Sequence, residues 1–433
     1  MKESEEEWPR PPPHPSLSYI EPSPPLVGQT LYLGGELGPD KNIYCIPGHA
    51  SRVLAIYPNK SGSNEGGSGG DDDDRCIQIG PEFIGKFKWL RGILACNDII
   101  YGLPCHADSI LRIDARDSTK DVSITTIPIP YDDEAYFENE EERTREREMI
   151  WKYHGGNISP NDNCIYCIPQ SATRVLKIDP RDESLSFVGP SLPGKYKWYG
   201  GLVGKSDGAI YGIPQNSGSV LRILPKADGS VSVTLHGDLG TGLHQWHGGG
   251  VSSDGTIVGI PNNADKILII KPPSGAENKE EADPELQIIG GSNVIATGKN
   301  VGRRDRKYKY LGSASDENCN VYCFPSGAEK VLRVNTSTLK IDEIGPSLYE
   351  SKLERLKQNK WQNGFYCPVD KCIYAIPLAA ETVLKVDMNS TDDCDGIEEG
   401  KNDQSGVNTL GLPQPHNGLA KWEGMQLCRR LFT

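Results

Sequence analysis

The chain has 433 residues, of which 36% are hydrophobic and 24% are charged, and its formal net charge is −13. This composition is typical of a folded globular protein, and the acidic balance argues against a nucleic-acid partner, which needs a basic surface. No apolar run is long enough to span a bilayer, so we expect no membrane partner. The first residues lack the apolar core of a secretory leader, and twelve cysteines then suggest reduced thiols in a cytoplasmic protein.

One motif occurs seven times along the chain. It usually reads Ile-Tyr-x-Ile-Pro, and a leucine lies seven residues after each proline. The copies are NIYCIPGHASRVLAI (42–56), IIYGLPCHADSILRI (99–113), CIYCIPQSATRVLKI (164–178), AIYGIPQNSGSVLRI (209–223), TIVGIPNNADKILII (256–270), NVYCFPSGAEKVLRV (320–334) and CIYAIPLAAETVLKV (372–386). Repetition of one motif every 45 to 65 residues predicts a repeat architecture.

Two further elements flank each copy. An aromatic residue precedes the motif tyrosine by 12 or 13 residues, and a stretch such as SFVGP (186–190) follows the motif. The preceding aromatics are Tyr32, Trp89, Tyr153, Trp198, Trp246, Tyr310 and Trp361, with an additional one at Trp422. Each unit therefore reads as four short strands, A to D, joined by turns rich in Asp, Asn and Gly, with the proline at the end of strand B.

Units of 45 to 65 residues with four short strands each are typical of a propeller. We predict an all-β fold, a seven-bladed β-propeller of four-stranded antiparallel blades with strand A innermost; eight blades with one incomplete copy is the alternative. Leu17–Glu21 resembles a strand D and Trp422–Phe432 a strand A. We therefore expect the ring to be closed by overlap of the N- and C-terminal strands, which removes an exposed sheet edge.

The domain organisation follows from the same repeat. We expect residues 1–16 to be a disordered acidic and proline-rich tail and residues 17–433 to form a single propeller domain. Loop insertions are expected at 60–74, 132–150 and 271–284, and the second of these is rich in helix formers.

Most of the histidines lie at one end of the predicted ring. In an antiparallel meander the B–C and D–A loops share one face, which we call the top face. Seven of the eight histidines fall in or near these loops: His49, His106, His154, His236, His244, His247 and His416. Side chains carried by loops on a rigid scaffold often form functional sites, although loops also carry polar residues for solubility.

The aromatic series at the start of strand A has two interpretations. A ring of aromatics could stack on a ligand, but occurrence in every unit favours packing between blades. Departures from the repeat are more informative. Leu33, Leu90 and Leu311 follow the aromatic in three blades, whereas the other blades have a polar residue or a ring at this position. These departures, with two loop histidines, give the predicted ligand-binding set: His49, His106, His154, Tyr199, His247, Gln362 and Glu423. A lysine directly precedes most of the aromatics. These lysines could form a basic collar or could lie over the Trp rings, and we favour the second interpretation.

No catalytic or metal signature is visible in the sequence. We expect no cofactor; a divalent metal is the alternative, with His244, His247 and His154 as its first candidate ligands. Cys164 and Cys167 are three apart on a predicted strand and face opposite ways, so small-residue packing is the better interpretation than a zinc or redox pair. If the protein is an enzyme, the candidate catalytic residues are His154, His247, His244 and His106.

The blade pattern, clearest in IYGIPQNSGSVLRI, loosely resembles that of the streptogramin (virginiamycin B) lyases. That resemblance implies a propeller whose top-face histidine acts as a base near a divalent metal. Two functions follow. We favour a binding or scaffold protein, monomeric, that uses the top face for a protein partner or a small-molecule ligand; the alternative is a lyase or hydrolase with a histidine general base that acts on a small molecule or oligosaccharide.

Overall fold

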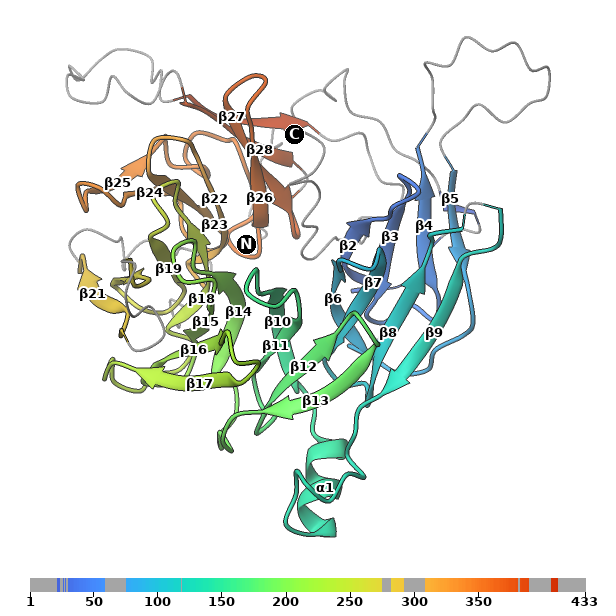
Figure 1. The fold of residues 1–433 in the computed structure, drawn as a ribbon. Helices are drawn as coiled ribbons and strands as arrows, with labels where there is room; N and C mark the ends of the chain where they lie inside the picture. Colours follow the sequence, from blue (N-terminus) through green and yellow to red (C-terminus); the bar gives the residue numbers. More distant parts are fainter. Residues whose placement is uncertain are drawn as a thin grey trace, which may run out of the picture.

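The computed structural model describes residues 22–23, 26, 28, 30–58, 75–117, 119–274, 282–291, 308–380, 382–388 and 406–411. These residues form seven β-sheets arranged as blades around one axis, in chain order (Figure 1). The predicted all-β, seven-bladed propeller is therefore confirmed, and in every blade the four antiparallel strands are consecutive in the sequence.

The first four blades span residues 22–236. Blade one contains β2 (Tyr32–Leu37), β3 (Ile43–Pro47), β4 (Val53–Tyr57) and β5 (Arg75–Ile79), with β1 (Pro22–Ser23) added parallel to β5. Blade two contains β6 (Trp89–Leu94), β7 (Ile99–Pro104), β8 (Ser109–Asp114) and β9 (Ser123–Pro128). Blade three contains β10 (Tyr153–Ile158), β11 (Ile165–Pro169), β12 (Val175–Asp179) and β13 (Ser184–Val188). Blade four contains β14 (Trp198–Val203), β15 (Ile210–Pro214), β16 (Val220–Pro225) and β17 (Val231–His236).

The last three blades complete the described ring. Blade five contains β18 (Trp246–Val251), β19 (Ile257–Pro261), β20 (Ile267–Lys271) and β21 (Glu285–Ile289). Blade six contains β22 (Tyr310–Ser315), β23 (Asn320–Pro325), β24 (Val331–Asn335) and β25 (Ile341–Ile344). Blade seven contains β26 (Trp361–Cys367), β27 (Cys372–Pro377), β28 (Thr382–Asp387) and β29 (Val407–Gly411). The expected closure by Leu17–Glu21 and Trp422–Phe432 lies outside the described residues, as do the tail 1–16 and the whole insertion 60–74.

The motif tyrosine of strand B secures the A–B turn below it. The Tyr166 hydroxyl donates to the Asp162 carboxylate at 2.6 Å, and the Tyr211 hydroxyl donates to Asp207 at 2.7 Å. Tyr44, Tyr322 and Tyr374 make the equivalent bond, whereas the Tyr101 hydroxyl accepts from the side-chain amide of Asn97 at 2.9 Å. Because the turn carboxylate or amide also accepts from nearby backbone N–H groups, this pairing explains why Tyr recurs at a buried strand position where an aliphatic residue would otherwise suffice.

Most of the core lies between neighbouring blades, and one smaller cluster lies within blade one. One buried cluster combines Ile99 and Leu103 of blade two with Ile165 and Leu176 of blade three. Cys167 belongs to this cluster, whereas Cys164 belongs to the next one, between blades three and four. The two cysteines therefore face opposite ways and are small buried packing residues, as the sequence predicted.

Glycine in strand A allows the innermost strands to approach each other at the axis. A Cβ atom on Gly155 would lie 2.8 Å from the Cα of Gly200, and Gly155 has a left-handed φ of 87°. The ladder between strands A and B is interrupted by a bulge beside this position. Blade seven has Asn363 here, with φ 61°, and asparagine is among the residues that best tolerate this conformation.

The insertion between blades two and three contains the helix α1 (Glu140–Glu148), which lies outside the ring of blades in Figure 1. Asn139 caps it by accepting a bond from the Glu142 N–H, and the buried Glu146 carboxylate accepts from the Thr173 N–H of blade three. In the part of the chain that the structure describes, no helix is long and apolar enough to cross a membrane.

Candidate functional site on the top face

The aromatics that begin each strand A are packing residues. Tyr32, Trp89, Tyr153, Trp198, Trp246, Tyr310 and Trp361 are all at most 4% exposed. The indole nitrogens of Trp198 and Trp361 donate to the carbonyls of Ser219 and Thr382 at 2.7 Å. These seven rings hold the blades together and are not available to a ligand, which confirms the packing interpretation; Trp422 lies outside the described residues.

The lysines before these aromatics join neighbouring blades. The Lys88 ammonium donates to the carbonyls of Gly48 and Ala50 of blade one, at 3.0 and 2.8 Å. Lys152, Lys197, Lys309 and Lys360 repeat this contact with the B–C loop of the preceding blade. Our expectation that the lysines lie over Trp rings was wrong as a general description. Lys197 does lie near the Trp198 ring, but its ammonium also binds carbonyls.

The residues that follow the seven buried aromatics form what we call the channel layer: Leu33, Leu90, His154, Tyr199, His247, Leu311 and Gln362. On blades three to five this layer carries three closely spaced rings, tilted by 43° and 36° to one another, which we call the ring stack. The centroids of His154 and Tyr199 are 3.8 Å apart, and those of Tyr199 and His247 are 3.7 Å apart. Because the three rings stand on adjacent innermost strands, the stack lies at the axis, at the end of each strand nearest the top face.

Both histidines of this stack are held neutral. Burial lowers the pKa of His154 to about 4 and that of His247 to about 3. No carboxylate among the described residues hydrogen bonds to either ring. A neutral imidazole offers one donor and one acceptor, so at neutral pH these rings recognise uncharged hydrogen-bonding groups.

A second set of rings surrounds the channel layer. The residue directly before the lysine position has a left-handed φ between 48° and 58° in every blade. On five blades it carries a ring, and we call this set the aromatic collar: Phe87, Trp151, Tyr196, His244 and Tyr308. Thr30 and Asn359 occupy the position on blades one and seven.

The left-handed conformation of the collar is stabilised by one recurrent hydrogen bond. The carbonyl of each left-handed residue accepts from the backbone N–H of the B–C loop in the same blade, for example Trp151 from Ser171 at 3.0 Å and Tyr196 from Asn216 at 3.0 Å. A large side chain in this conformation costs on the order of 1 kcal/mol relative to glycine. The rings are therefore retained on the top face at a cost in stability.

The collar rings Phe87 and Trp151 join the channel layer in one arc of rings, whereas Tyr196, His244 and Tyr308 form a second row with centroids 6.3 and 5.6 Å apart. His49 contacts Phe87 at 4.3 Å, and His106 contacts Trp151 at 4.9 Å. Phe87 and Trp151 lie 4.7 Å apart, and the Trp151 ring is stacked with that of His154 at 6.3 Å. Burial and the Lys152 charge lower the pKa of His106 as well. The arc covers blades one to five.

Buried polar side chains lie where strand B ends. We call the residues after the strand-B proline on blades three to six the amide arc: Gln170, Gln215, Asn262 and Ser326. All four are at most 4% exposed. Gln170 donates to Gln215 at 3.0 Å, and Gln215 lies 2.6 Å from Nδ1 of His244, which links this arc to the collar.

Several of these buried polar atoms make no hydrogen bond within the described residues. They are Nδ1 of His154, Oε1 of Gln170, both amide atoms of Asn262, Oγ of Ser326 and Oε1 of Gln362. Gln170 is close enough to His154 to favour its protonated form, yet no hydrogen bond of normal geometry joins them. Buried polar groups are rarely left without a partner in folded proteins. At the top face these atoms offer hydrogen-bond donors and acceptors that no described residue satisfies.

The structure brings together most of the predicted site residues. His49, His106, His154, Tyr199 and His247 share the arc of rings, and His244 lies beside Gln215 of the amide arc. Gln362 is in the channel layer on blade seven, and Glu423 lies outside the described residues.

Sequence reasoning missed four rings of the collar. Phe87, Trp151, Tyr196 and Tyr308 each stand two residues before a buried aromatic, as in Tyr196-Lys197-Trp198. This alternation of ring, Lys and ring was visible in the sequence. What the sequence did not reveal was the left-handed backbone that turns the first ring away from the core.

The alternative of a metal site has little support in the side chains. Among the described residues, no three His, Cys, Asp or Glu side chains are grouped so that they could hold an ion together. His154 and His247 are separated by the Tyr199 ring that stacks between them.

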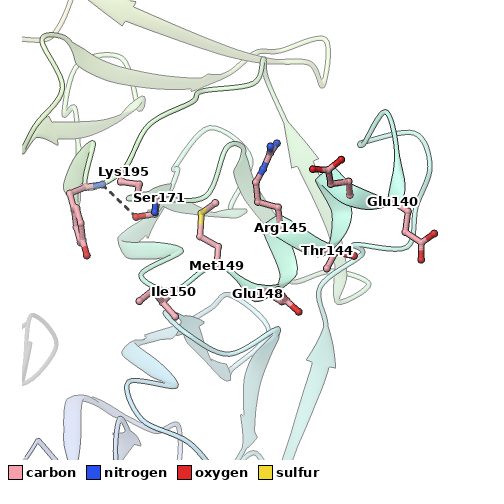
Figure 2. Close-up of a pocket in the computed structure, with 10 residues that line it drawn as sticks. Glu140, Thr144, Arg145, Glu148, Met149, Ile150, Ser171 and Lys195 are labelled. Atoms are coloured by element: carbon pink, nitrogen blue, oxygen red, sulfur yellow. Dashed lines mark hydrogen bonds between the residues drawn. The ribbon is translucent and has the colours of Figure 1, made fainter.

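A further hollow adjoins the collar (Figure 2). It has a volume of about 850 Å³ and lies between helix α1 and the loops of blades three and four. Its lining includes Glu141, Arg145, Ser171, Lys195 and the collar residue Tyr196. The hollow is mainly charged at its helix side.

Comparison with known proteins shows the fold. No protein-family model and no curated protein matches the chain. Among solved structures, a streptogramin B lyase is similar, with a TM-score of 0.50 and 13% identity over 83% of this chain and 94% of that one. The extracellular domain of BT4673 from B. thetaiotaomicron has a TM-score of 0.50 and 11% identity, over 83% of this chain and 41% of that one. Virginiamycin B lyase from Staphylococcus aureus has a TM-score of 0.47 and 13% identity, over 89% of this chain and 96% of that one. The two likenesses with a TM-score of 0.50 show a shared β-propeller fold and nothing more specific.

Proposed function

We propose that the chain is a binding protein whose ligand occupies the top face at the mouth of the axis. The observation that carries this proposal is the group of buried amide, hydroxyl and imidazole atoms that make no hydrogen bond among the described residues, together with the His154–Tyr199–His247 stack. A site with apolar ring faces and a few convergent polar groups is typical of ligand recognition. The aromatic collar supports the proposal, because the chain keeps large rings where glycine would cost less.

Binding accounts for the histidines better than catalysis does. A general base works best when its pKa is close to the working pH, and an imidazole with a pKa of about 4 is a weak base at neutral pH. An orienting carboxylate, which would raise the basicity of His154 or His247, is not among their contacts in the described residues. The neutral imidazoles of His154 and His247 can still hydrogen bond to a ligand and stack on it at neutral pH.

The direct test is a ligand screen by thermal shift, repeated with Tyr199→Ala and Phe365→Ala. Tyr199 is central to the ring stack, whereas Phe365 is a partly exposed ring toward the opposite end of innermost strand β26. A ligand that raises the melting temperature of the native protein and of Phe365→Ala, but not of Tyr199→Ala, supports the proposal. A ligand whose effect survives Tyr199→Ala places its site elsewhere.

Whether the ligand is a small molecule or a protein partner is decided by the same variants. A partner recovered by the native chain and lost with Tyr199→Ala would favour the scaffold form of the proposal. If no partner is recovered while a small molecule gives a clear thermal shift, the scaffold form is wrong and the small-molecule form stands.

A second candidate is a lyase or hydrolase with a histidine base. The observation that favours it is the Nδ1 atom of His154, which makes no hydrogen bond among the described residues. Turnover of a ligand found in the screen, lost with His154→Ala while binding persists, would establish this activity. Binding without turnover at any pH between 5 and 9 would reject it.

A further inference from the structure

We propose that the top-face site takes a neutral oligosaccharide, which lies across the collar with one end at the channel layer. This inference rests on the proposed function and deepens it by naming the chemical class of the ligand. Three properties of the site lead to it: the neutrality of the unpaired polar atoms, their mixed donor and acceptor character, and the spread of ring faces around them.

The atoms of the channel layer and the amide arc that make no hydrogen bond among the described residues are all uncharged. They belong to imidazole, amide and hydroxyl groups, and neither the channel layer nor the amide arc contains an Asp, Glu, Lys or Arg side chain. A charged ligand group would therefore find no counter-charge in these two layers, and leaving a charge unpaired in a desolvated site is costly. The net charge of −13 further disfavours an anion.

The same atoms require both donors and acceptors from the ligand. The carbonyl oxygens of Gln170, Asn262 and Gln362 can only accept, whereas Nδ2 of Asn262 can only donate. The Ser326 hydroxyl can do either. A sugar hydroxyl donates and accepts at once, so a ligand with several adjacent hydroxyls satisfies this mixture without a fixed orientation at each contact.

The rings provide the complementary apolar contact. Phe87, Trp151, Tyr196 and Tyr308 are each partly exposed and follow one another around the top face on blades two, three, four and six. A pyranose has one face made of C–H groups, and such a face packs well on an aromatic ring. Rings spread over several blades suit a chain of sugar units better than a single compact molecule.

The hollow beside α1 extends this surface outward. Tyr196 belongs to both the collar and the hollow, and Ser171 at the boundary accepts a bond from the Tyr196 N–H at 3.4 Å (Figure 2). The carboxylates of Glu140, Glu141 and Glu148 line the helix side. Carboxylates accept hydrogen bonds from sugar hydroxyls, so the hollow fits a further unit of the same neutral chain.

The test is calorimetric titration of the full chain with four hexameric probes: maltohexaose, cellohexaose, hexagalacturonate and an uncharged hexapeptide. The variants are Trp151→Gly and Tyr196→Gly, which remove a collar ring while retaining a residue that accepts the left-handed backbone, and the control is Phe365→Ala. Thermal unfolding of each variant confirms that it is folded. We expect a neutral hexasaccharide to bind, its affinity to fall about tenfold in each collar variant and to stay unchanged in the control. Shortening the saccharide to two units should weaken binding by a similar factor.

Failure of this inference can be told apart from failure of the proposed function. If the peptide or the galacturonate binds with the same sensitivity to Trp151→Gly, while neither neutral saccharide binds, the ligand class is wrong and the top-face site stands. If a saccharide binds and neither collar variant weakens it, both the inference and its site are wrong. If none of the probes binds, the oligosaccharide inference is rejected, while the ligand screen with Tyr199→Ala still decides the proposed function.

Discussion

The Nζ atom of Lys197 donates a hydrogen bond to the carbonyl oxygen of Ala172 at 2.9 Å and thereby joins blade four to blade three. It also donates to the carbonyl of Gly194. Burial lowers the pKa of this ammonium to about 8, so it is protonated at pH 7. The same contact at the other described lysine positions makes it the recurrent polar link of the ring.

Replacing this lysine should therefore loosen the ring. Lys197→Met keeps the length of the side chain but leaves buried carbonyls unpaired, and we expect the free energy of unfolding to fall by about 1–3 kcal/mol. Lys195→Met, at an exposed position two residues earlier, should change it by less than about 0.5 kcal/mol. Denaturant unfolding measures both. A gain in stability for Lys197→Met would mean that the cost of burying the charge exceeds the value of its hydrogen bonds.

The close approach of strands at the axis leads to a second prediction, which concerns the stability of two glycine variants. Gly155→Ala would place a Cβ 2.8 Å from the backbone of Gly200, at a φ of 87°. Gly229→Ala has nearly the same φ, 85°, with no atom within 4 Å of the added Cβ. Both variants lose about 1–2 kcal/mol to the left-handed backbone, and Gly155→Ala should lose about 1–3 kcal/mol more because the innermost strands must separate. Equal losses in thermal or denaturant unfolding would contradict close packing at the axis.

The strain in the collar predicts an unusual order of substitutions. Tyr196 has a φ of 53°, so Tyr196→Gly should be more stable than Tyr196→Ala by about 1 kcal/mol, the reverse of the usual order. Both variants remove the ring, so the comparison isolates the backbone term. Paired melting curves measure the difference. An alanine variant that is as stable as the glycine variant would show that the collar backbone relaxes when its ring is lost.

The neutral histidines predict a loss of stability in weak acid. The pKa values of His154 and His247, about 4 and about 3 in the folded chain, lie below the ordinary value of about 6.5 expected in the unfolded chain. Between pH 6.5 and 4 the unfolded chain binds protons that the folded chain does not, so the free energy of unfolding falls as the pH falls. Above pH 6.5 this contribution is complete.

The size of the effect can be measured by urea unfolding at pH 7, 6 and 5. Each histidine contributes up to about 1.4 kcal/mol per pH unit within its window. In the double variant His154→Gln, His247→Gln, the free energy of unfolding should fall less steeply as the pH falls. Part of the fall should remain, because the pKa values of His106 and His236 are also lowered. Asp179, with a pKa of about 2, acts only below about pH 4. An unchanged slope in the double variant would show that these two rings accept protons in the folded state.

Repetition made the fold readable from the sequence. The proline that ends strand B and the leucine seven residues later recur in every unit, so the pattern predicted the strands, their order and the number of blades. The structural roles of the tyrosine and the lysine were less visible. Tyr166 needs Asp162 across a turn, and Lys197 needs carbonyls from another blade, so neither role appears in a comparison of repeats.

The candidate site was predicted in part, for a related physical reason. His154, Tyr199 and His247 were found because they depart from the repeat, and departures are visible in one sequence. Trp151 and Tyr196 were missed because the sign of φ decides whether a ring faces the core or the top face, and φ is set by hydrogen bonds to a loop about 20 residues away.

The sequence by itself thus determined the blade, its four strands and the end of the ring on which histidines gather. Only the tertiary structure decided which side chains meet. His154, Tyr199 and His247 are 45 and 48 residues apart in sequence, yet the centroids of successive rings lie within 4 Å of each other at the axis. This is possible because innermost strands that contain glycine can pack closely there. Burial at that axis, rather than any local motif, lowers the pKa values of the histidines, and the amide atoms of Asn262 make no hydrogen bond among the described residues.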